Sequence, residues 1–321
     1  MRRGSLEYWP HRRAKKLMAR VRHWTESKEP ALLGFIGFKA GMTHVMYVDN
    51  SNGPAKGTEI AEPVTVLEVP KVYVYGARFY SKNPQTGYKQ VAEEVYDKQL
   101  AKNVGILQTS KTDISKLKDK ADSFEDITVL AYVDPMGVGF GTKKRMRFEL
   151  ALGGSNKEKL ELVEKLLGKE VKISDVFKTG EYVDVTSISK GKGWEGPIRR
   201  FGVARQRRKA TGRIRHVGTL GPFKPPKVLY TVPMAGGLGH NYRTELNKRI
   251  MKIGSQSEAS SINVSGGFPH YGVVRNDFVL VHGSVPGAPG MLVRLRKALR
   301  PVKPATEQKI NAISLKSKIG A

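Results

Sequence analysis

Apolar residues in this chain occur in short alternating or continuous runs that are typical of β-strands. Residues 31–49 place β-branched and aromatic side chains on both sides of Lys39-Ala40-Gly41, which predicts two strands joined by a turn. Residues 277–299 predict two more strands around the Pro/Gly-rich connection Ser284–Gly290. Further runs of the same kind occupy residues 63–80 and 126–134. The pattern therefore predicts a mainly β core.

Helical periodicity is confined to the middle of the chain. Ser155 and Glu158 have the spacing of a capping box, and apolar residues follow at helical spacing from Leu160 until Gly168. A weaker helix is predicted to begin near Ser110. We therefore expect a β-rich core, folded as a barrel, with an α/β insertion between its strands.

The composition adds a strong positive charge to this picture. The 321 residues include 56 Lys and Arg against 29 Asp and Glu, a formal net charge of +27. Because such a charge repels itself, it indicates a polyanionic partner, either nucleic acid or an anionic membrane. No apolar run approaches the ~20 residues of a spanning helix, so we expect nucleic acid and no membrane. The absence of cysteine excludes disulfides and thiolate metal sites and fits a cytoplasmic protein.

The charge is concentrated in two segments. Residues 1–30 hold 9 basic and 3 acidic side chains, and residues 190–253 hold 16 basic and 2 acidic ones. Residues 93–181 hold 16 of each and carry no net charge. Lysines that serve only solubility would be spread evenly, so the distribution favours two segments that bind nucleic acid.

Residues 190–253 show neither a strand nor a helix period and are rich in Gly, Pro and Arg. A long basic segment of this kind inside a compact domain is expected to become ordered on RNA. The glycines of Ser189–Gly202 would let the backbone approach RNA closely; a flexible turn is the alternative. Phe223, flanked by prolines, would be an exposed tip; the alternative is a side chain folded into the core.

Basic, polar and aromatic residues of both segments form the predicted interface. Arginine can hold a phosphate with two hydrogen bonds and can stack on bases. The small residues at the start of Pro233–Gly254 suit passage between RNA strands, and His240 is expected to donate to phosphate. The predicted RNA-binding residues are Arg2, Arg3, Arg12, Arg13, Lys15, Lys16, Lys190, Lys192, Trp194, Arg199, Arg200, Arg205, Arg207, Arg208, Lys209, Arg213, Arg215, His216, Phe223, Lys224, Lys227, His240, Asn241, Arg243, Lys248 and Arg249.

Signatures of an enzyme are not found in the sequence. Ser189–Gly202 lacks the Gly-Lys-Ser/Thr of a Walker A loop, and Gly139–Thr142 lacks the third glycine of a dinucleotide fingerprint. The seven histidines show no metal-ligand spacing. We therefore expect no catalytic residue, no metal and no cofactor. Two other hypotheses stay open: a free-standing RNA-modifying protein with a translation-factor-like barrel, and an architectural RNA binder or RNA chaperone.

Five motifs, in this order, resemble the ribosomal protein L-three family, the universal third protein of the large ribosomal subunit. They are FKAGMTHV (38–45), SKGKGWEGPIRRFG (189–202), MAGGLGHNYRT (234–244), GGFPHYG (266–272) and VHGSVPGAPG (281–290). The resemblance covers nearly the whole chain. The basic arm, the neutral insertion and the modest length are similar to the archaeal form.

The resemblance implies a fold: a six-stranded β-barrel like the second domain of translation factors, interrupted by an α/β insertion and by a long finger loop that penetrates rRNA. The implied division is a basic N-terminal arm (1–30), the first part of the barrel (31–80), the α/β insertion (81–181), a barrel strand with the finger extension (182–256), the barrel closure (257–300) and a C-terminal tail (301–321).

The resemblance also implies a function. Such a protein is a structural constituent of the large subunit; it binds large-subunit rRNA near the peptidyl transferase centre and the factor-binding region, and supports assembly and translation. Its expected partners are rRNA, the neighbouring proteins L-fourteen and L-twenty-four-e, and translation factors nearby, without homo-oligomerisation. Trp194 matches an aromatic of the family's GKGWEG run. Phe223 falls at the finger tip, where many eukaryotic relatives have tryptophan, so the indole N–H donor is absent here.

Overall fold

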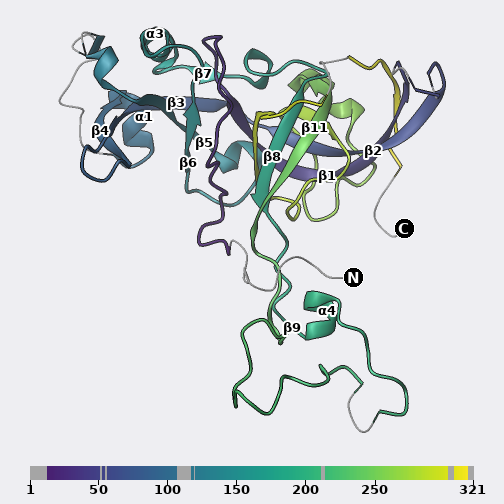
Figure 1. Ribbon diagram of the computed structural model, residues 1–321. Coiled ribbons are helices and arrows are strands. Elements are labelled where there is room, and N and C mark those ends of the chain that lie inside the picture. Colours follow the sequence, from purple (N-terminus) through teal and green to yellow (C-terminus); the bar gives the residue numbers. More distant parts are fainter. Residues whose placement is uncertain are drawn as a thin grey trace.

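The protein folds into a body of two antiparallel sheets and a long extension that leaves the body on one side (Figure 1). This computed structural model describes residues 13–50, 53–54, 56–106, 117–118, 120–210, 214–302 and 307–316. The prediction of a mainly β fold is confirmed, because most of the regular structure consists of strands and the helices are few and short.

Seven strands form the larger sheet. They are β1 (Gly34–Val48), β2 (Glu59–Val69), β8 (Tyr182–Ile188), β11 (Tyr242–Gly254), β12 (Asp277–His282), β13 (Leu292–Lys297) and β14 (Ile310–Ile313). Neighbours pair in the order β13-β8-β11-β12-β2-β1-β14, and β13 also pairs with β1. The pairing therefore runs from β13 through β8, β11, β12, β2 and β1 and back to β13. We call these six strands the ring.

β1 is one strand of 15 residues, so the predicted turn at Lys39-Ala40-Gly41 is wrong. The pairing of β1 with β2 shifts between Lys39 and Gly41, which makes Ala40 a bulge without reversing the chain. A Cβ at Gly41 would lie 2.5 Å from the ring of Phe268. The glycine that suggested a turn is therefore required for a close contact.

The smaller sheet is formed by the chain between β2 and β8. Its strands are β3 (Val72–Lys82), β4 (Lys89–Tyr96), β5 (Asp126–Val133), β6 (Met146–Ala151) and the short β7 (Glu170–Val171). They pair in the order β4-β3-β5-β6, and β7 pairs with β3. Because β3 belongs to this sheet, the first segment of the ring ends at Val69, whereas the sequence placed the boundary at residue 80.

The helix predicted from its capping box is present as α3 (Asn156–Leu166). Glu158 Oε2 accepts a hydrogen bond from the Ser155 N–H at 2.8 Å. The helix predicted near Ser110 lies outside the described residues. The other short elements of the body are α1 (Lys98–Asn103) and the 3₁₀ turns η1 (Ala121–Ser123), η2 (Pro135–Val138), η3 (Ile173–Asp175) and η4 (Gln256–Ser261). Within the described chain, no helix is long and apolar enough to cross a membrane.

One hydrophobic cluster spans both sheets. Phe35 and Phe38 of β1 are buried in it together with Val74 and Phe79 of β3. A second, smaller cluster contains Phe278 of β12. Burial of a side chain as large as phenylalanine contributes about 1.5–3 kcal/mol. The shared cluster therefore couples the smaller sheet to the ring.

Buried arginines of β13 attach the N-terminal arm to the ring. Arg296 donates to Asp184 Oδ2 from Nε at 3.2 Å and from Nη2 at 2.9 Å, and it also donates to the His23 carbonyl. Arg294 Nη1 donates to the Ala19 carbonyl at 3.4 Å. Burial lowers the pKa of Arg294 to about 10. These contacts hold part of the predicted RNA-binding arm against the protein itself.

We expect Asp184→Ala to destabilise the fold strongly. The change leaves the Arg296 guanidinium buried without its carboxylate, a loss that costs about 3–5 kcal/mol. Urea unfolding followed by circular dichroism measures the change in the free energy of unfolding. The control is Glu258→Ala, which removes a more exposed ion pair with Lys252 and should cost less than about 1 kcal/mol. Equal losses in both variants would contradict the structural role of Asp184.

Candidate nucleic-acid interface

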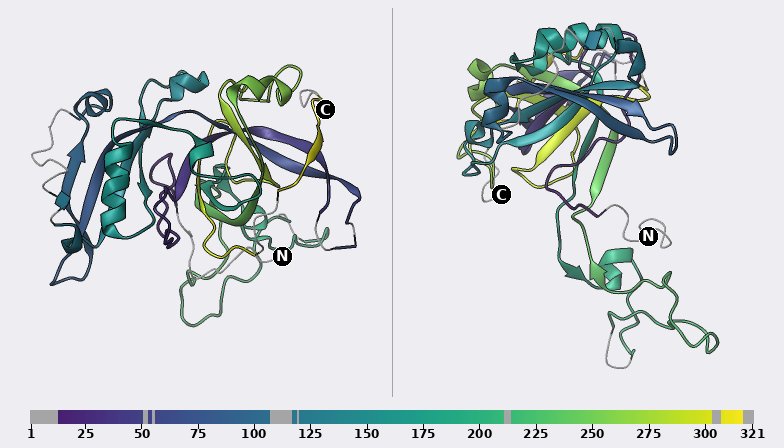
Figure 2. Two further views of the ribbon diagram at one scale, coloured as in Figure 1. Left: turned by 90° about the horizontal axis from the view of Figure 1, so that it is seen from above. Right: turned by 90° about the vertical axis from the view of Figure 1, so that its left-hand side faces the viewer.

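The extension covers residues 189–241 and projects away from the body as a long hairpin (Figures 1 and 2). It begins where β8 ends and returns to the body where β11 begins. We call residues 189–195 and 236–241 its neck, and residues 203–235 its outer part.

The two chains of the neck continue the pairing of β8 with β11. Ser189 N donates to the Asn241 carbonyl, and Lys192 N donates to the Leu238 carbonyl, both at 2.9 Å. Farther from the body, the pairing ends with two short strands, β9 (Trp194–Glu195) and β10 (Gly236–Gly237). The ring therefore determines the direction in which the extension leaves the body.

Part of the segment predicted to lack regular structure is a strand of the ring. Tyr242–Gly254 form β11, which pairs with β8 and β12. Its register shifts between Glu245 and Lys248, and most of the residues before the shift are exposed. Because this half of β11 buries no regular apolar face, its sequence shows no alternation that would predict a strand.

The small residues of the neck contact the protein's own chain, whereas the sequence predicted passage between RNA strands. Gly239 has φ +81°, and a Cβ at this position would overlap the Lys190 carbonyl. A Cβ at Gly236 would lie 2.6 Å from Arg200 Nη1. The glycines are therefore required for close approach within the extension.

Arg200 braces the extension from the short helix α4 (Pro197–Phe201). Its side chain is buried, Nη1 donates to the Met234 carbonyl at 3.0 Å, and Nε donates to the Gly237 carbonyl at 3.2 Å. Burial lowers the pKa of Arg200, and the positive charge of Arg13 lowers it further. Arg200 therefore has partners within the chain, and its guanidinium holds the two chains of the extension together; its contact with phosphate stays a prediction.

The outer part of the extension has no helix or strand and no buried side chain in its described residues, 203–210 and 214–235. Its backbone hydrogen bonds include local turns, such as Ala210 N to the Arg207 carbonyl at 2.9 Å, and one contact from Gln206 N to the Ile214 carbonyl at 3.0 Å. The predicted RNA-binding residues that are exposed there are Arg205, Arg207, Arg208, Lys209, Arg215, His216, Phe223, Lys224 and Lys227. Contacts within the chain therefore contribute little to the conformation of this part.

Aromatic side chains are exposed along the extension. Phe223 is 92% exposed, Trp194 is 80% exposed and Tyr230 is 77% exposed. Such side chains can stack on bases. Tyr230 was not among the predicted ligands, because its neighbours in the sequence are not basic. Tyr230 could have been predicted as an RNA-binding residue, because it is an aromatic residue in a segment that has no hydrophobic core to bury it.

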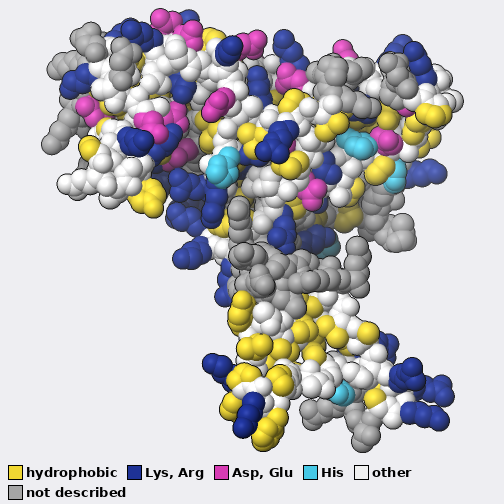
Figure 3. All heavy atoms as spheres, viewed as in Figure 1, with side chains coloured by type: hydrophobic (Ala, Val, Ile, Leu, Met, Phe, Trp, Pro, Cys, Tyr) yellow, Lys and Arg dark blue, Asp and Glu magenta, His cyan; other side chains and the backbone are white. Residues whose placement is uncertain are grey.

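The extension carries almost no negative charge. Glu195 is the single acidic residue of residues 189–241, and its Oε1 pairs with Arg199 Nη1 at 2.8 Å. On the face shown in Figure 3, Lys and Arg side chains lie on both the body and the extension, whereas Asp and Glu side chains are seen only on the body. The balance of charge is therefore more positive on the extension than on the body.

The structure brings the arm and the neck together. Arg13 forms an antiparallel bridge with Asn241, and Ala14 N donates to the His240 carbonyl at 2.9 Å. Asn241 is buried. The exposed basic residues that meet at this place are Arg13, Lys15, Lys16, Lys190, Lys192 and His240. Two basic segments that are far apart in the sequence thus form one surface. Arg2, Arg3, Arg12 and Arg213 lie outside the described residues.

The predicted residues of β11 differ in their surroundings. Arg243 is exposed. Arg249 Nη2 donates to Tyr47 Oη at 3.4 Å and lies over the Tyr47 ring. Lys248 Nζ lies 3.8 Å from Glu245 Oε2. Lys248 and Arg249 therefore have partners within the body, which the sequence pattern did not predict.

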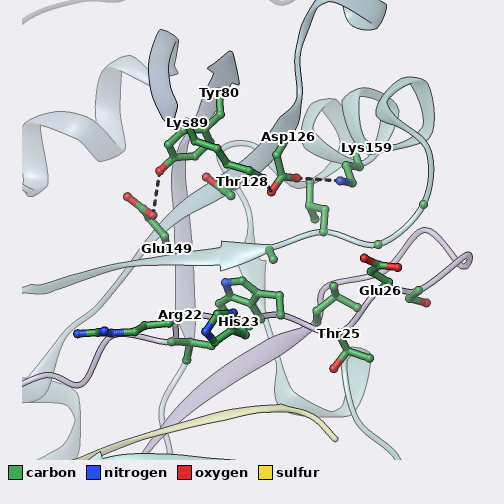
Figure 4. Close-up of a pocket in the computed structure, with 18 of the residues that line it drawn as sticks. Arg22, His23, Thr25, Glu26, Tyr80, Lys89, Asp126, Thr128, Glu149 and Lys159 are labelled. Carbon is green, nitrogen blue, oxygen red and sulfur yellow. Dashed lines mark hydrogen bonds and ion pairs between the residues drawn. The ribbon is translucent and has the colours of Figure 1, made fainter. Parts of the chain in front are cut away.

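A cavity of about 600 Å³ lies between the arm and the smaller sheet (Figure 4). The two acidic groups on the smaller sheet have partners on that sheet or on α3: Asp126 Oδ1 pairs with Lys159 Nζ at 2.9 Å, and Glu149 Oε2 accepts from Tyr80 Oη at 3.1 Å. No group of three or more His, Cys, Asp or Glu side chains in the described residues could hold a metal ion. The cavity therefore separates the arm from the smaller sheet, and polar side chains of both line it.

We expect Arg200→Met to loosen the extension while the ring stays intact. The change removes two hydrogen bonds to backbone carbonyls, so amide hydrogen exchange should become faster at residues 196–202 and 234–238. Exchange measured by mass spectrometry resolves these residues from the body. The control is Arg199→Met, which removes an exposed cation of the same helix and should change exchange little. Equal exchange in wild type and Arg200→Met would contradict the bracing role.

The amino-acid sequence is similar to those of known proteins. A family model described as Ribosomal protein L3 matches residues 1–320. The large ribosomal subunit protein uL3 of Methanobrevibacter smithii is 42% identical over 329 residues, which cover 99% of this chain and 98% of the relative. The uL3 protein of Thermoplasma acidophilum is 42% identical over 327 residues, with the same two coverages. That of Methanothermobacter thermautotrophicus is 41% identical over 331 residues, also covering 99% and 98%. The chain thus belongs to the ribosomal protein L3 family.

Proposed function

We propose that this chain, as a structural constituent of the large ribosomal subunit, binds large-subunit rRNA through its extension, its neck and its arm. The observation that carries the proposal is the outer part of the extension, which combines exposed arginines and aromatics with no buried side chain in its described residues. Ordering a backbone costs about 1–2 kcal/mol per residue. Contacts within the chain do not offset that cost here, and an RNA surface would.

The chemistry of the exposed groups supports RNA as the partner. Guanidinium groups such as Arg205 and Arg207 can hold a phosphate with two hydrogen bonds, and rings such as Phe223 can stack on bases. Each phosphate that the protein neutralises would steepen the salt dependence of binding by about 0.7–0.9 on a log-log scale. Several such contacts along one extension would give strong binding at physiological salt.

The ring supports the finer proposal of a closed six-stranded barrel as the base of the extension. Both strands that lead into the extension, β8 and β11, have partners on both sides within the ring. Because both strands are held on each side, the direction in which the hairpin leaves the body is fixed. The smaller sheet and its helices would be the α/β insertion of this barrel.

Membership in the family supports a place for these parts in the subunit. The extension would run through rRNA toward the peptidyl transferase centre, and the body would lie near the factor-binding region. The proteins L-fourteen and L-twenty-four-e would be neighbours of the body, and the chain would support subunit assembly. A free-standing RNA-modifying protein is not favoured, because the relatives are named as proteins of the large ribosomal subunit.

The proposed function predicts that the chain sediments with large subunits. In a sucrose gradient of native cell extract, we expect one copy per large subunit by quantitative mass spectrometry. The association should survive a wash in high salt, because an extension embedded in rRNA cannot dissociate as a surface-bound protein does. A known peripheral subunit protein in the same gradient is the control. Release of this chain into the top fractions at low salt would contradict the proposal.

The exposed tip predicts a specific translation defect. In cells whose only copy carries Phe223→Ala, we expect normal amounts of large subunits and an altered rate or fidelity of translation, because the change removes an exposed ring and no core contact. Phe223→Trp should preserve function, since it keeps the aromatic face. Tyr88→Ala is the matched control, because this aromatic is exposed on the body. Unchanged rate and fidelity in Phe223→Ala would count against a role of the tip.

A further inference from the structure

Two motifs that the proposed interface does not use meet at the base of the extension. Lys39 of β1 is buried, and its Nζ donates to the Val285 carbonyl at 2.5 Å and to the Gly287 carbonyl at 3.2 Å. Both carbonyls belong to the loop between β12 and β13. The backbone of Lys39 also contacts this region, since its carbonyl accepts from Gly290 N at 2.8 Å. The Lys39 ammonium group is therefore held by two backbone carbonyl groups of this loop.

This loop packs against the chain that leads into the neck. A Cβ at Gly287 would lie 3.0 Å from Ser187 Oγ and 3.3 Å from the Ile188 carbonyl. Lys190 follows two residues later and is exposed. Burial lowers the pKa of Lys39, and the charge of Lys190 lowers it further. The loop that holds Lys39 thus packs against the segment that leads to Lys190 at the root of the neck.

The pair has no carboxylate partner in the described part of the chain: no ion pair joins Lys39 or Lys190 to an Asp or Glu, and no acidic group acts on the pKa of Lys39. Buried ammonium groups are normally paired, because removing a charge from water is costly. The two carbonyls accept two of the three hydrogens of the Lys39 ammonium, which leaves one donor. Two like charges and an unused donor are suited to an anion that is not part of the chain.

We propose that Lys39 and Lys190 bind one phosphate of the RNA backbone between them at the root of the extension. This inference rests on the proposed function and specifies one site within it. The surroundings favour a polyanion over an isolated acidic side chain, because exposed Lys192 and His240 lie on the same neck and exposed Arg13 of the arm pairs with it. Lys39 is rigid and Lys190 is exposed, so the phosphate fixes the neck to the ring where β8 ends.

The test is the salt dependence of binding to purified large-subunit rRNA. The full-length chain is compared with Lys39→Gln, Lys190→Met and the double variant. Glutamine keeps N–H donors for the two carbonyls and removes the charge. We expect the double variant to lose about 0.7–0.9 in the slope of log K against log salt, the contribution of one phosphate, and each single variant to lose less, because the other lysine still holds that phosphate.

The matched control combines Lys39→Gln with Lys192→Met. Lys192 is an exposed neck lysine that does not share the proposed phosphate, so the two losses should add. A loss in Lys190→Met alone as large as that of the double variant would mean that Lys39 only braces the loop, and losses of one phosphate in each single variant that add in the double variant would mean two separate phosphates. Either result overturns the proposal. A flat slope in the wild type would instead contradict the proposed function.

A second measurement uses the wild-type chain and does not depend on the folding of a variant. Side-chain ammonium resonances of ¹⁵N-lysine-labelled protein are followed while inorganic phosphate is added. We expect the signals of Lys39 and Lys190 to shift together with one dissociation constant, and that of Lys192 to shift differently. Movement of Lys190 without Lys39 would overturn the shared site. Shifts with phosphate but no loss of slope in the variants would also overturn it, since the site would then bind the free ion and not RNA.

Discussion

The pairing of β8 with β11 is the interaction on which the rest of the structure depends. Within the body, each of these strands has a second partner, β13 for β8 and β12 for β11, so neither can move without disrupting the ring. The same two chains remain hydrogen-bonded beyond the body as far as β9 and β10. The extension is therefore a hairpin whose base belongs to the hydrophobic core, and this explains how a segment without its own core is presented in one direction.

Burial and charge are separated along this hairpin. Near the core, charges are buried only with strong partners, as in the contact of Arg296 with Asp184 at 2.9 Å. On either side of the neck, Arg200 of α4 and Lys39 of β1 are buried against backbone carbonyls. In the outer part, basic side chains are exposed. Cations near the ring are buried against partners within the chain, whereas those of the outer part are exposed, so an external anion is needed most in the outer part.

The predicted interface shows what local sequence can and cannot reveal. The position of the basic segments and the exposed Phe223 followed from charge and proline content, which are local properties. The hydrogen bonds of Arg200 to backbone carbonyls of the extension could not be predicted, because an arginine that braces two chains has the same sequence signature as one that binds phosphate. Lys39 was missed for the opposite reason: a single lysine within an apolar run gives no charge signal. Contact with RNA stays a prediction for every residue of the interface, and Arg2, Arg3, Arg12 and Arg213 also lie outside the described residues.

Alternation, capping and charge act between neighbours in the chain, so they predict the mainly β class, the helix after Ser155 and the separation of neutral from basic segments. They do not predict that Ala40 is a bulge within one strand, that residues 242–254 complete the ring, or that the arm lies against the neck. Each of these depends on partners that are distant in the sequence. Hydrogen bonds and packing between such partners leave no periodic trace in either segment.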